Sequence, residues 1–376
     1  MGSPLRRKHP PHAHLAASGR PSRPGLEARP GDVPAAGTAS RRGRAFSAGR
    51  SSSTATSTSP SPPYGAYWRA LRKLCALELL CGFKVRQLAP TRDRETMSLV
   101  REVVRRCSGE GPVVVNLGEL LVSCASSITG LAAFGDRCSG DLMEQFLSAI
   151  SVVIFNISGF CVSDLFPSLW ISGGTGTVSS TAEWVMAELM KNPDAMVKAQ
   201  NEVRRAFKNI GPHDHESQME ELYYTRMVIK ETLRLHPPLP LLLPRVCRET
   251  CNVGPFEVAK GSRVIINSWA IARSPEHWDD AEKFKPERFE NSMADFKGTH
   301  FEYLPFGYGR RMCPGSGFGI SVLELMVARL LYYFDWSLPD GMRPEELDMD
   351  MTVGASAKRT NQLHLVASPY EVLMDL

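Results

Sequence analysis

The residues of this chain best suited to chemistry lie in one short loop, residues 306–315, with the sequence FGYGRRMCPG. Cys313 supplies a thiol, and a thiolate ligand needs positive charge nearby to keep its pKa low. Gly307 and Gly309 have no Cβ and can adopt positive φ, so the backbone N–H groups of a tight loop can point at the sulfur. The loop therefore predicts a metal-binding thiolate with enough open space for a flat macrocycle.

A helix is expected directly after this loop. Pro314 favours an extended conformation at Cys313 and suits the first turn of a helix. From Ser316 onward, apolar residues recur at helical spacing, at Phe318, Val322, Leu325, Met326 and Leu330. The sulfur would then lie at a helix N-terminus, where the helix dipole favours an anion. The alternative is a buried structural thiol in a glycine-rich turn.

The loop matches a known signature. The pattern F-x-x-G-x-R-x-C-x-G is complete at Phe306, Gly309, Arg311, Cys313 and Gly315. This pattern is typical of the cytochrome P450 haem-thiolate monooxygenases, which the chain resembles over most of residues 64–376. The sequence around the motifs is most similar to the plant A-type group, which oxidises specialised metabolites such as terpenoids. The resemblance implies that Cys313 binds the iron of haem b and that Arg311 contacts a haem propionate.

Three further residues would contact the haem by resemblance. Trp68 and Arg72 match a W-x-x-x-R pair of the family, and Arg245 is a second candidate for a propionate. The alternative for the pair is a core tryptophan beside an exposed arginine. His236 and His277 are not expected to bind iron, because His236 ends a helix beside proline and His277 lies in a polar turn.

A structural triad is also implied. Glu231 and Arg234 stand three residues apart on a predicted helix at 222–235, and Arg288 lies in a downstream PERF sequence. An i,i+3 ion pair is common on any helix surface, so the pair alone says little. The family, however, supplies the second guanidinium from the position of Arg288. The resemblance implies a buried triad that fixes the fold around the cysteine loop and does not donate protons.

The central helix of the family matches in part. Gly173 and Gly174 fit the glycine pair that loosens the helix beside O₂, and Thr177 fits the threonine that delivers protons. The acid that normally precedes the threonine is replaced by Gly176. Either Ser179, Ser180 and water substitute for it, or O–O cleavage slows and peroxide is released. A threonine that bonds back to its own helix is the alternative for Thr177.

The sequence also predicts gaps relative to the family. Residues 164–170 resemble the loop after the roof helix predicted at 142–157, yet from Ile171 the chain already resembles the middle of the central helix. The fold expected is therefore mainly α with a small β component, a cytochrome P450-like fold. It would be incomplete, lacking the N-terminal strands, part of the roof helices and the first half of the central helix. Its haem domain would occupy residues 64–376. Residues 64–170 would form an N-terminal helical part, and residues 171–376 would hold the central helix, the haem-binding loop and the C-terminal part.

Other elements follow from periodicity and breaker residues. Residues 64–106 predict two helices with a break at Ala89-Pro90. Further helices are predicted at 117–133 and 193–207, and short strands at 256–258 and 263–267.

Residues 1–63 differ in composition from the remainder. They are rich in Pro, Ser and Arg and hold ten basic residues against two acidic ones, which predicts a disordered tail. Removing these from the 44 basic and 40 acidic residues of the chain leaves residues 64–376 with a net charge of −4. The basic charge thus gives no evidence for nucleic-acid binding by the folded part. An organelle transit peptide and translated upstream sequence are the alternatives for the tail.

The number and spacing of the cysteines and the hydropathy of the chain bear on the cellular compartment of the protein. The nine cysteines are odd in number and scattered, which favours reduced thiols, and Cys247 and Cys251 are interpreted as structural. No apolar run is long enough to span a bilayer. Family resemblance implies the endoplasmic reticulum membrane, whereas the lack of an anchor favours a soluble or organelle-targeted form.

The activity implied by the resemblance is insertion of one oxygen atom from O₂ into a small hydrophobic substrate. The electrons would come from NADPH through an NADPH-cytochrome P450 reductase. Two alternatives stay open: a non-catalytic or uncoupled remnant that lacks a complete substrate pocket, and a haem-thiolate isomerase or dehydratase. Thr177 argues against the second of these, since such an enzyme uses no O₂.

Overall fold

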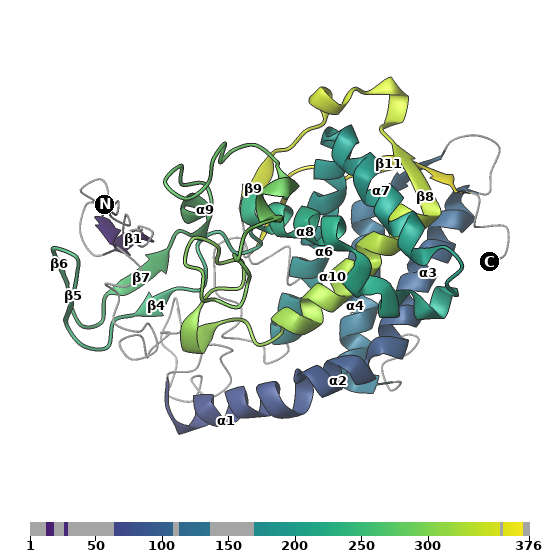
Figure 1. Ribbon diagram of the computed structural model, residues 1–376. Coiled ribbons are helices and arrows are strands. Elements are labelled where there is room, and N and C mark those ends of the chain that lie inside the picture. Colours follow the sequence, from purple (N-terminus) through teal and green to yellow (C-terminus); the bar gives the residue numbers. More distant parts are fainter. Residues whose placement is uncertain are drawn as a thin grey trace, which may run out of the picture.

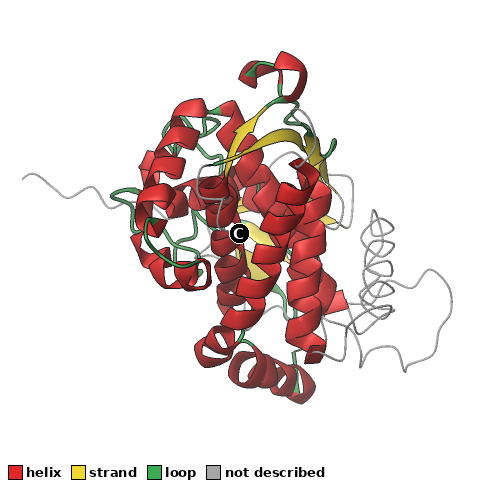
Figure 2. Cartoon of the chain, turned by 90° about the vertical axis from the view of Figure 1, so that its right-hand side faces the viewer, coloured by secondary structure: helices red, strands yellow, loops and turns green. Residues whose placement is uncertain are grey.

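The computed structural model describes residues 13–18, 26–28, 64–107, 113–135, 169–353 and 356–370. Helices dominate these residues, and the strands form small separate sheets (Figure 2). The prediction of a mainly helical fold with a small β component is confirmed. The roof helix predicted at 142–157 lies outside the described residues.

Four helical segments open the folded part. They are α1 (Ala66–Leu74), a π-helical turn η1 (Cys75–Leu79), α2 (Gly82–Gln87) and α3 (Ala89–Cys107). The predicted break at Ala89-Pro90 is confirmed, because α2 ends at Gln87 and α3 begins at Ala89. Pro90 lies in the first turn of α3, where a missing N–H breaks no hydrogen bond. A further break, which was not predicted, lies between η1 and α2. In Figure 1, α1 and α2 lie along the edge of the molecule, and no residue of α1 is buried.

Five further long helices form the core together with α3. They are α4 (Leu117–Phe134), α6 (Leu169–Lys191), α7 (Pro193–Phe207), α8 (Tyr223–Leu235) and α10 (Ser316–Tyr333). The predicted helices at 117–133, 193–207 and 222–235 are confirmed. Helix α6 starts at Leu169, so the last two residues of the predicted loop at 164–170 are helical and continue directly into the central helix. Helix α6 packs against both α4 and α10 (Figure 1).

Two core helices are long and apolar enough to cross a membrane within the described part of the chain. Half of the apolar window of α4 and 72% of that of α10 are buried inside the fold. Both helices therefore have the burial expected of core helices.

The largest sheet has the strand order β2-β1-β7-β4. Its strands are β1 (Ala13–Ser18), β2 (Leu26–Ala28), β4 (Arg245–Val246) and β7 (Arg263–Ile266). Strand β1 pairs antiparallel with β7, with Leu15 opposite Ile266. These two N-terminal strands lie within residues 1–63, for which the composition predicted no packed structure. A segment set apart by its composition therefore supplies half of this sheet.

The remaining strands form three smaller sheets. One contains β3 (Val114–Asn116), β11 (His364–Pro369) and β8 (Phe334–Ser337). The others are the hairpins of β5 (Cys251–Val253) with β6 (Phe256–Val258) and of β9 (Met351–Val353) with β10 (Ala357–Arg359). The predicted strands at 256–258 and 263–267 are confirmed. Short helical segments complete the fold: α9 (Ser268–Ile271), η4 (Pro212–Glu221), η5 (Pro286–Phe289), η6 (Gly309–Arg311), η7 (Pro339–Gly341) and η8 (Pro344–Glu346).

Candidate functional site

The cysteine loop is a tight turn that leads into α10. Gly307 and Gly309 have φ of 69° and 67°, the left-handed region that favours glycine. The backbone N–H of Cys313 donates to the Phe306 carbonyl at 3.0 Å, which closes the loop. A Cβ built at Gly309 meets no atom within 4 Å, so this side of the loop is open. Gly315 then caps α10, and the sulfur stands just before the helix N-terminus.

The electrostatics of Cys313 differ from the sequence-based expectation of a lowered pKa. The residue is exposed, yet desolvation by surrounding protein raises the pKa of its thiol above the ordinary value. A hydrogen bond from the backbone of Gly315 and the charge of Arg72 act in the opposite direction but are weaker. Desolvation at the loop thus opposes the thiolate form. A metal cation bound at this sulfur would favour the thiolate, because metal coordination deprotonates a thiol.

Three arginines gather beside the loop. Desolvation lowers the pKa of Arg311, and the positive charges of Arg245 and Arg72 lower it further. Arg245 is buried, and its Nη2 donates to the Tyr308 carbonyl at 3.3 Å, while its Nη1 has no hydrogen-bond partner among the described residues. A buried guanidinium nitrogen without a partner is costly. This cluster consequently fits a ligand that carries carboxylates, as the propionates of haem do.

Helix α1 reaches the loop through the predicted W-x-x-x-R pair. Arg72 Nη1 donates to the Met312 carbonyl at 2.6 Å, and the Arg311 guanidinium lies 4.9 Å from the centre of the Trp68 ring. Both Trp68 and Arg72 are partly buried, so neither the core tryptophan nor the exposed arginine of the alternative is observed. The structure brings both residues to the cysteine loop, together with Arg311.

Gly298 is a loop residue that sequence reasoning missed. Its φ is 77°, and a Cβ built on it would lie 3.2 Å from the Gly307 carbonyl oxygen and from the Met312 sulfur. The segment around Gly298 thus packs directly against the cysteine loop. No motif surrounds this glycine, so only its spatial neighbours reveal it. Phe306 is held on another side by Phe296, with ring centres 5.6 Å apart.

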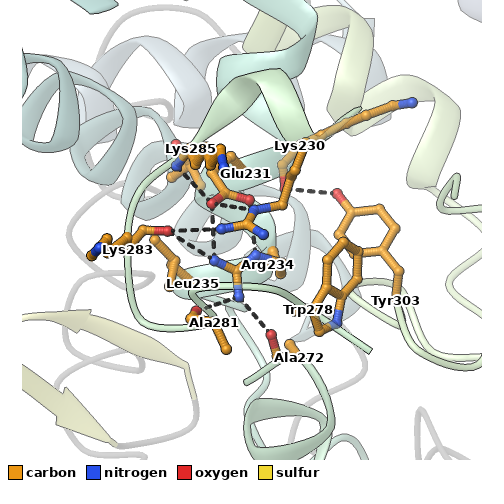
Figure 3. Close-up of polar contacts among 12 residues, drawn as sticks. Lys230, Glu231, Arg234, Leu235, Ala272, Trp278, Ala281, Lys283, Lys285 and Tyr303 are labelled. Atoms are coloured by element: carbon orange, nitrogen blue, oxygen red, sulfur yellow. Dashed lines mark hydrogen bonds and ion pairs between the residues drawn. The ribbon is translucent and has the colours of Figure 1, made fainter. Parts of the chain in front are cut away.

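The predicted triad forms a connected ion cluster (Figure 3). Glu231 is fully buried and accepts two bonds from Arg234, at 2.8 Å from Nε and 2.9 Å from Nη2. Arg288 Nε donates to the same carboxylate at 2.9 Å, and the backbone N–H of Lys285 donates at 2.8 Å. Two cations and one amide therefore satisfy one buried carboxylate.

The triad is joined to the segment that enters the cysteine loop. The Arg234 guanidinium lies 5.4 Å from the centre of the Trp278 ring, and Trp278 Nε1 donates to the Glu302 carbonyl at 3.2 Å. The hydroxyl of the fully buried Tyr303 donates to the Lys230 carbonyl of α8 at 2.9 Å (Figure 3). Sequence reasoning missed both aromatic residues, since each lies outside a motif. They link the triad to residues 302–303, just before Phe306.

The central helix α6 carries the predicted glycine and threonine. Gly174 and Thr177 are partly buried, and a Cβ on Gly174 would lie 3.6 Å from the Thr129 methyl group of α4. The helix contacts α10 near Gly319, whose built Cβ would lie 3.6 Å from a methyl group of Val178.

Ser179 and Ser180 do not fit the predicted role of substitutes for the missing acid. Ser179 Oγ donates to the Thr175 carbonyl at 2.9 Å, and Ser180 Oγ donates to the Ala357 carbonyl at 2.8 Å. Both are buried. Their protons are thus committed to backbone carbonyls, which leaves Thr177 and water for proton delivery.

The histidines rejected as iron ligands lie in structural settings. His236 Nε2 is 2.6 Å from a carboxylate oxygen of Glu188, and its buried ring stacks on Trp184 with centres 3.8 Å apart. The backbone N–H of His277 donates to the Ser274 carbonyl in a turn. Across the described residues, no group of three or more His, Cys, Asp or Glu side chains is placed to hold a metal.

Comparison with known proteins agrees with this geometry. The family model described as Cytochrome P450 matches residues 169–365, which include the triad and the cysteine loop. The chain is 50% identical to 9-beta-pimara-7,15-diene oxidase of Oryza sativa subsp. japonica, over 82% of this chain and 74% of that protein. It is 39% identical to premnaspirodiene oxygenase of Hyoscyamus muticus, over 82% and 76%. Salviol synthase of Salvia pomifera is 36% identical, over 81% and 73%.

The chain belongs to the cytochrome P450 family, and its relatives are plant members of that family. The family and the named oxidases support a cytochrome P450 monooxygenase. The family also implies a haem cofactor and electrons from a reductase. Plant members are generally bound to membranes.

Proposed function

We propose that this protein is a haem-thiolate monooxygenase that inserts one oxygen atom from O₂ into a small hydrophobic plant metabolite of the terpenoid class. The observation that carries the proposal is the Nη1 of buried Arg245, which has no partner among the described residues and belongs to the arginine cluster with Arg311 beside the cysteine loop. These guanidinium groups would pair with the carboxylates of a haem held by Cys313. The names of the relatives, a diene oxidase and a premnaspirodiene oxygenase among them, support the terpenoid class.

Each residue has a defined role in this proposal. Cys313 holds the iron, and a bound haem supplies the activation of O₂ and the oxidation of a C–H bond. Arg72, Arg245 and Arg311 orient the macrocycle by pairing with its carboxylates. The Glu231 carboxylate and its two arginines hold the segments around the loop in place.

Proton delivery is the weak step. Thr177 would hold and pass the proton, while Gly176 offers no carboxylate. Since Ser179 and Ser180 are bonded to backbone carbonyls, water is the remaining donor. We therefore expect part of the reducing equivalents, supplied from NADPH through an NADPH-cytochrome P450 reductase, to leave as peroxide. Association with the endoplasmic reticulum membrane belongs to the same proposal.

A second candidate, an uncoupled or non-catalytic remnant, is favoured by one observation. Helix α1 and the turn η1 leave apolar side chains uncovered, with Leu74 48% and Leu77 53% exposed. Exposed apolar surface of this kind is typical of interaction sites and of folds that lack covering segments. No comparable observation favours an isomerase or dehydratase.

The carbon monoxide difference spectrum of the reduced protein tests haem binding first. A Soret band at the thiolate position that disappears in Cys313→Ala supports the proposal. Purified full-length protein that takes up no haem overturns it. Oxygen consumption with a reductase and terpenoid substrates then separates the candidates, because a monooxygenase yields hydroxylated product, whereas the remnant yields only peroxide.

A further inference from the structure

Two cysteines outside the haem site lie in contact with each other. The sulfur atoms of Cys247 and Cys251 are 3.6 Å apart, where the chain passes from β4 to the β5/β6 hairpin. Cys247 is buried, whereas Cys251 is partly exposed. We propose that this pair is a redox-active dithiol, which peroxide converts to an intramolecular disulfide and a thiol reductant restores.

The backbone holds both residues in position. Cys247 is fixed from two sides, since its N–H donates to the Ser262 carbonyl at 2.9 Å and its carbonyl accepts from Gly261 at 2.8 Å. Cys251 pairs with Val258 across the hairpin. A disulfide bond is about 2.05 Å long, so the sulfurs must approach by roughly 1.5 Å. Rotation of the partly exposed Cys251 side chain can supply a movement of this size without a shift of the hairpin.

The two thiols have different roles in the reaction. Burial, followed by the contact with Cys251, raises the pKa of the Cys247 thiol to about 11, so this group is a poor first nucleophile. The partly exposed Cys251, as the thiolate, attacks the peroxide, which forms an S–O bond, breaks the O–O bond and releases hydroxide. Cys247 sulfur then attacks the sulfenic acid, forming the S–S bond and expelling water. Two thiols and one hydrogen peroxide give one disulfide and two waters.

The short span favours a reversible bond. Only Arg248, Glu249 and Thr250 separate the two cysteines, and the Cys247 thiol now donates to the Glu249 carbonyl at 2.9 Å. Oxidation removes that hydrogen bond and closes a very small ring. Strained or exposed disulfides are reduced more easily than structural ones. The pair is therefore suited to repeated oxidation and reduction.

Peptide mapping of the full-length protein tests the proposal without reference to haem. The sample is exposed to stoichiometric hydrogen peroxide, free thiols are alkylated, and the protein is digested with trypsin. Trypsin cleaves after Arg245, Arg248 and Lys260, so the disulfide appears as peptide 246–248 linked to peptide 249–260. We expect this linked species in most of the oxidised protein and its loss after dithiothreitol.

Two controls make the result decisive. Cys251→Ser should abolish the link and leave Cys247 alkylated, because its thiol then has no sulfenic acid to attack. Cys107, a partly buried thiol bonded to the Ala367 carbonyl, is the internal reference for general oxidation. The proposal fails if Cys107 is oxidised while Cys247 and Cys251 both stay alkylated. It also fails if Cys251 proceeds to sulfinic acid with no linked peptide.

Discussion

Arg72 Nη1 donates a 2.6 Å hydrogen bond to the Met312 carbonyl, so a side chain of α1 holds the residue next to the cysteine although 240 positions separate the two. The same guanidinium is one of the three positive charges at the candidate anion site. Helix α1 thereby contributes both to the shape of the loop and to the charge beside it.

Arg72→Gln should weaken haem binding about tenfold or more, because a charged hydrogen bond worth roughly 1.5–3 kcal/mol is lost. The rate of haem transfer to an excess of a haem-binding acceptor protein measures this change. Lys73→Gln is the matched control, since Lys73 is an exposed cation on the same helix. Equal effects of the two variants would mean that net charge alone governs binding.

Glu231→Gln should destabilise the fold by about 3 kcal/mol, because it leaves two buried guanidinium groups without their anion. Urea unfolding followed by circular dichroism measures the loss. The control is Glu287→Gln. The Glu287 carboxylate is partly exposed and forms a surface ion pair with Lys198 at 2.7 Å. We expect less than about 1 kcal/mol there. A comparable cost for both substitutions would contradict the buried triad.

Gly298→Ala should lower the free energy of unfolding by about 2–3 kcal/mol, from the positive φ and from the contact at 3.2 Å with the cysteine loop. Gly341→Ala isolates the contribution of the positive φ. Gly341 has φ of 70° with no atom within 4 Å of a built Cβ, so about 1 kcal/mol is expected. Thermal unfolding of the two variants side by side gives the difference, and identical shifts would show that the loop contact is unimportant.

His215 should make stability sensitive to acid. Its buried ring stacks on Phe207 at 4.0 Å, and burial lowers its pKa to about 4, with the charge of Arg329 acting in the same direction. The unfolded chain binds this proton near pH 6.5 and the folded chain near pH 4, so stability is lost as the pH falls between these values. Wild type should lose roughly 2–3 kcal/mol more than His215→Gln from pH 7 to pH 4.

Urea unfolding at several pH values measures this loss. His364→Gln, at an exposed position, should retain the full pH dependence of wild type. A His215→Gln profile that parallels wild type would remove His215 as the cause.

Gly176→Asp should raise the share of consumed O₂ that appears in product by severalfold, because it supplies a carboxylate one residue before Thr177. Product and peroxide are quantified together during turnover with a reductase. Gly176→Asn has nearly the same shape without the ionisable group. If Asn improves coupling as much as Asp does, helix stability and not proton delivery is responsible.

The sequence predicted the parts of the site that depend on contiguous motifs. The pattern around Cys313 lies within one loop, and Glu231 and Arg234 lie on one helix. Their relative positions therefore follow from local structure alone. Arg288 required the family pattern, because nothing local indicates that its guanidinium reaches Glu231.

Other features depend on tertiary packing and could not be read from the chain. The raised pKa of Cys313 results from desolvation by burial, which outweighs the favourable hydrogen bond from Gly315 and the charge of Arg72. Trp278 and Tyr303 contact Arg234 and Lys230, which lie far away in sequence. Likewise, α6 starts at Leu169 although the residues that follow are rich in Gly, Ser and Thr, which have low helix propensity. Its packing against α4 and α10, which local sequence does not reveal, accounts for the helix.

The contact between Gly298 and the cysteine loop should constrain how the two segments vary among homologous sequences. Because a methyl group at this position would press on Gly307 and on the Met312 side chain, a larger residue there is tolerable only if the loop opposite has changed as well. Homologous sequences should therefore keep a glycine at 298 wherever methionine occupies 312. They should vary at the two positions together and not one at a time.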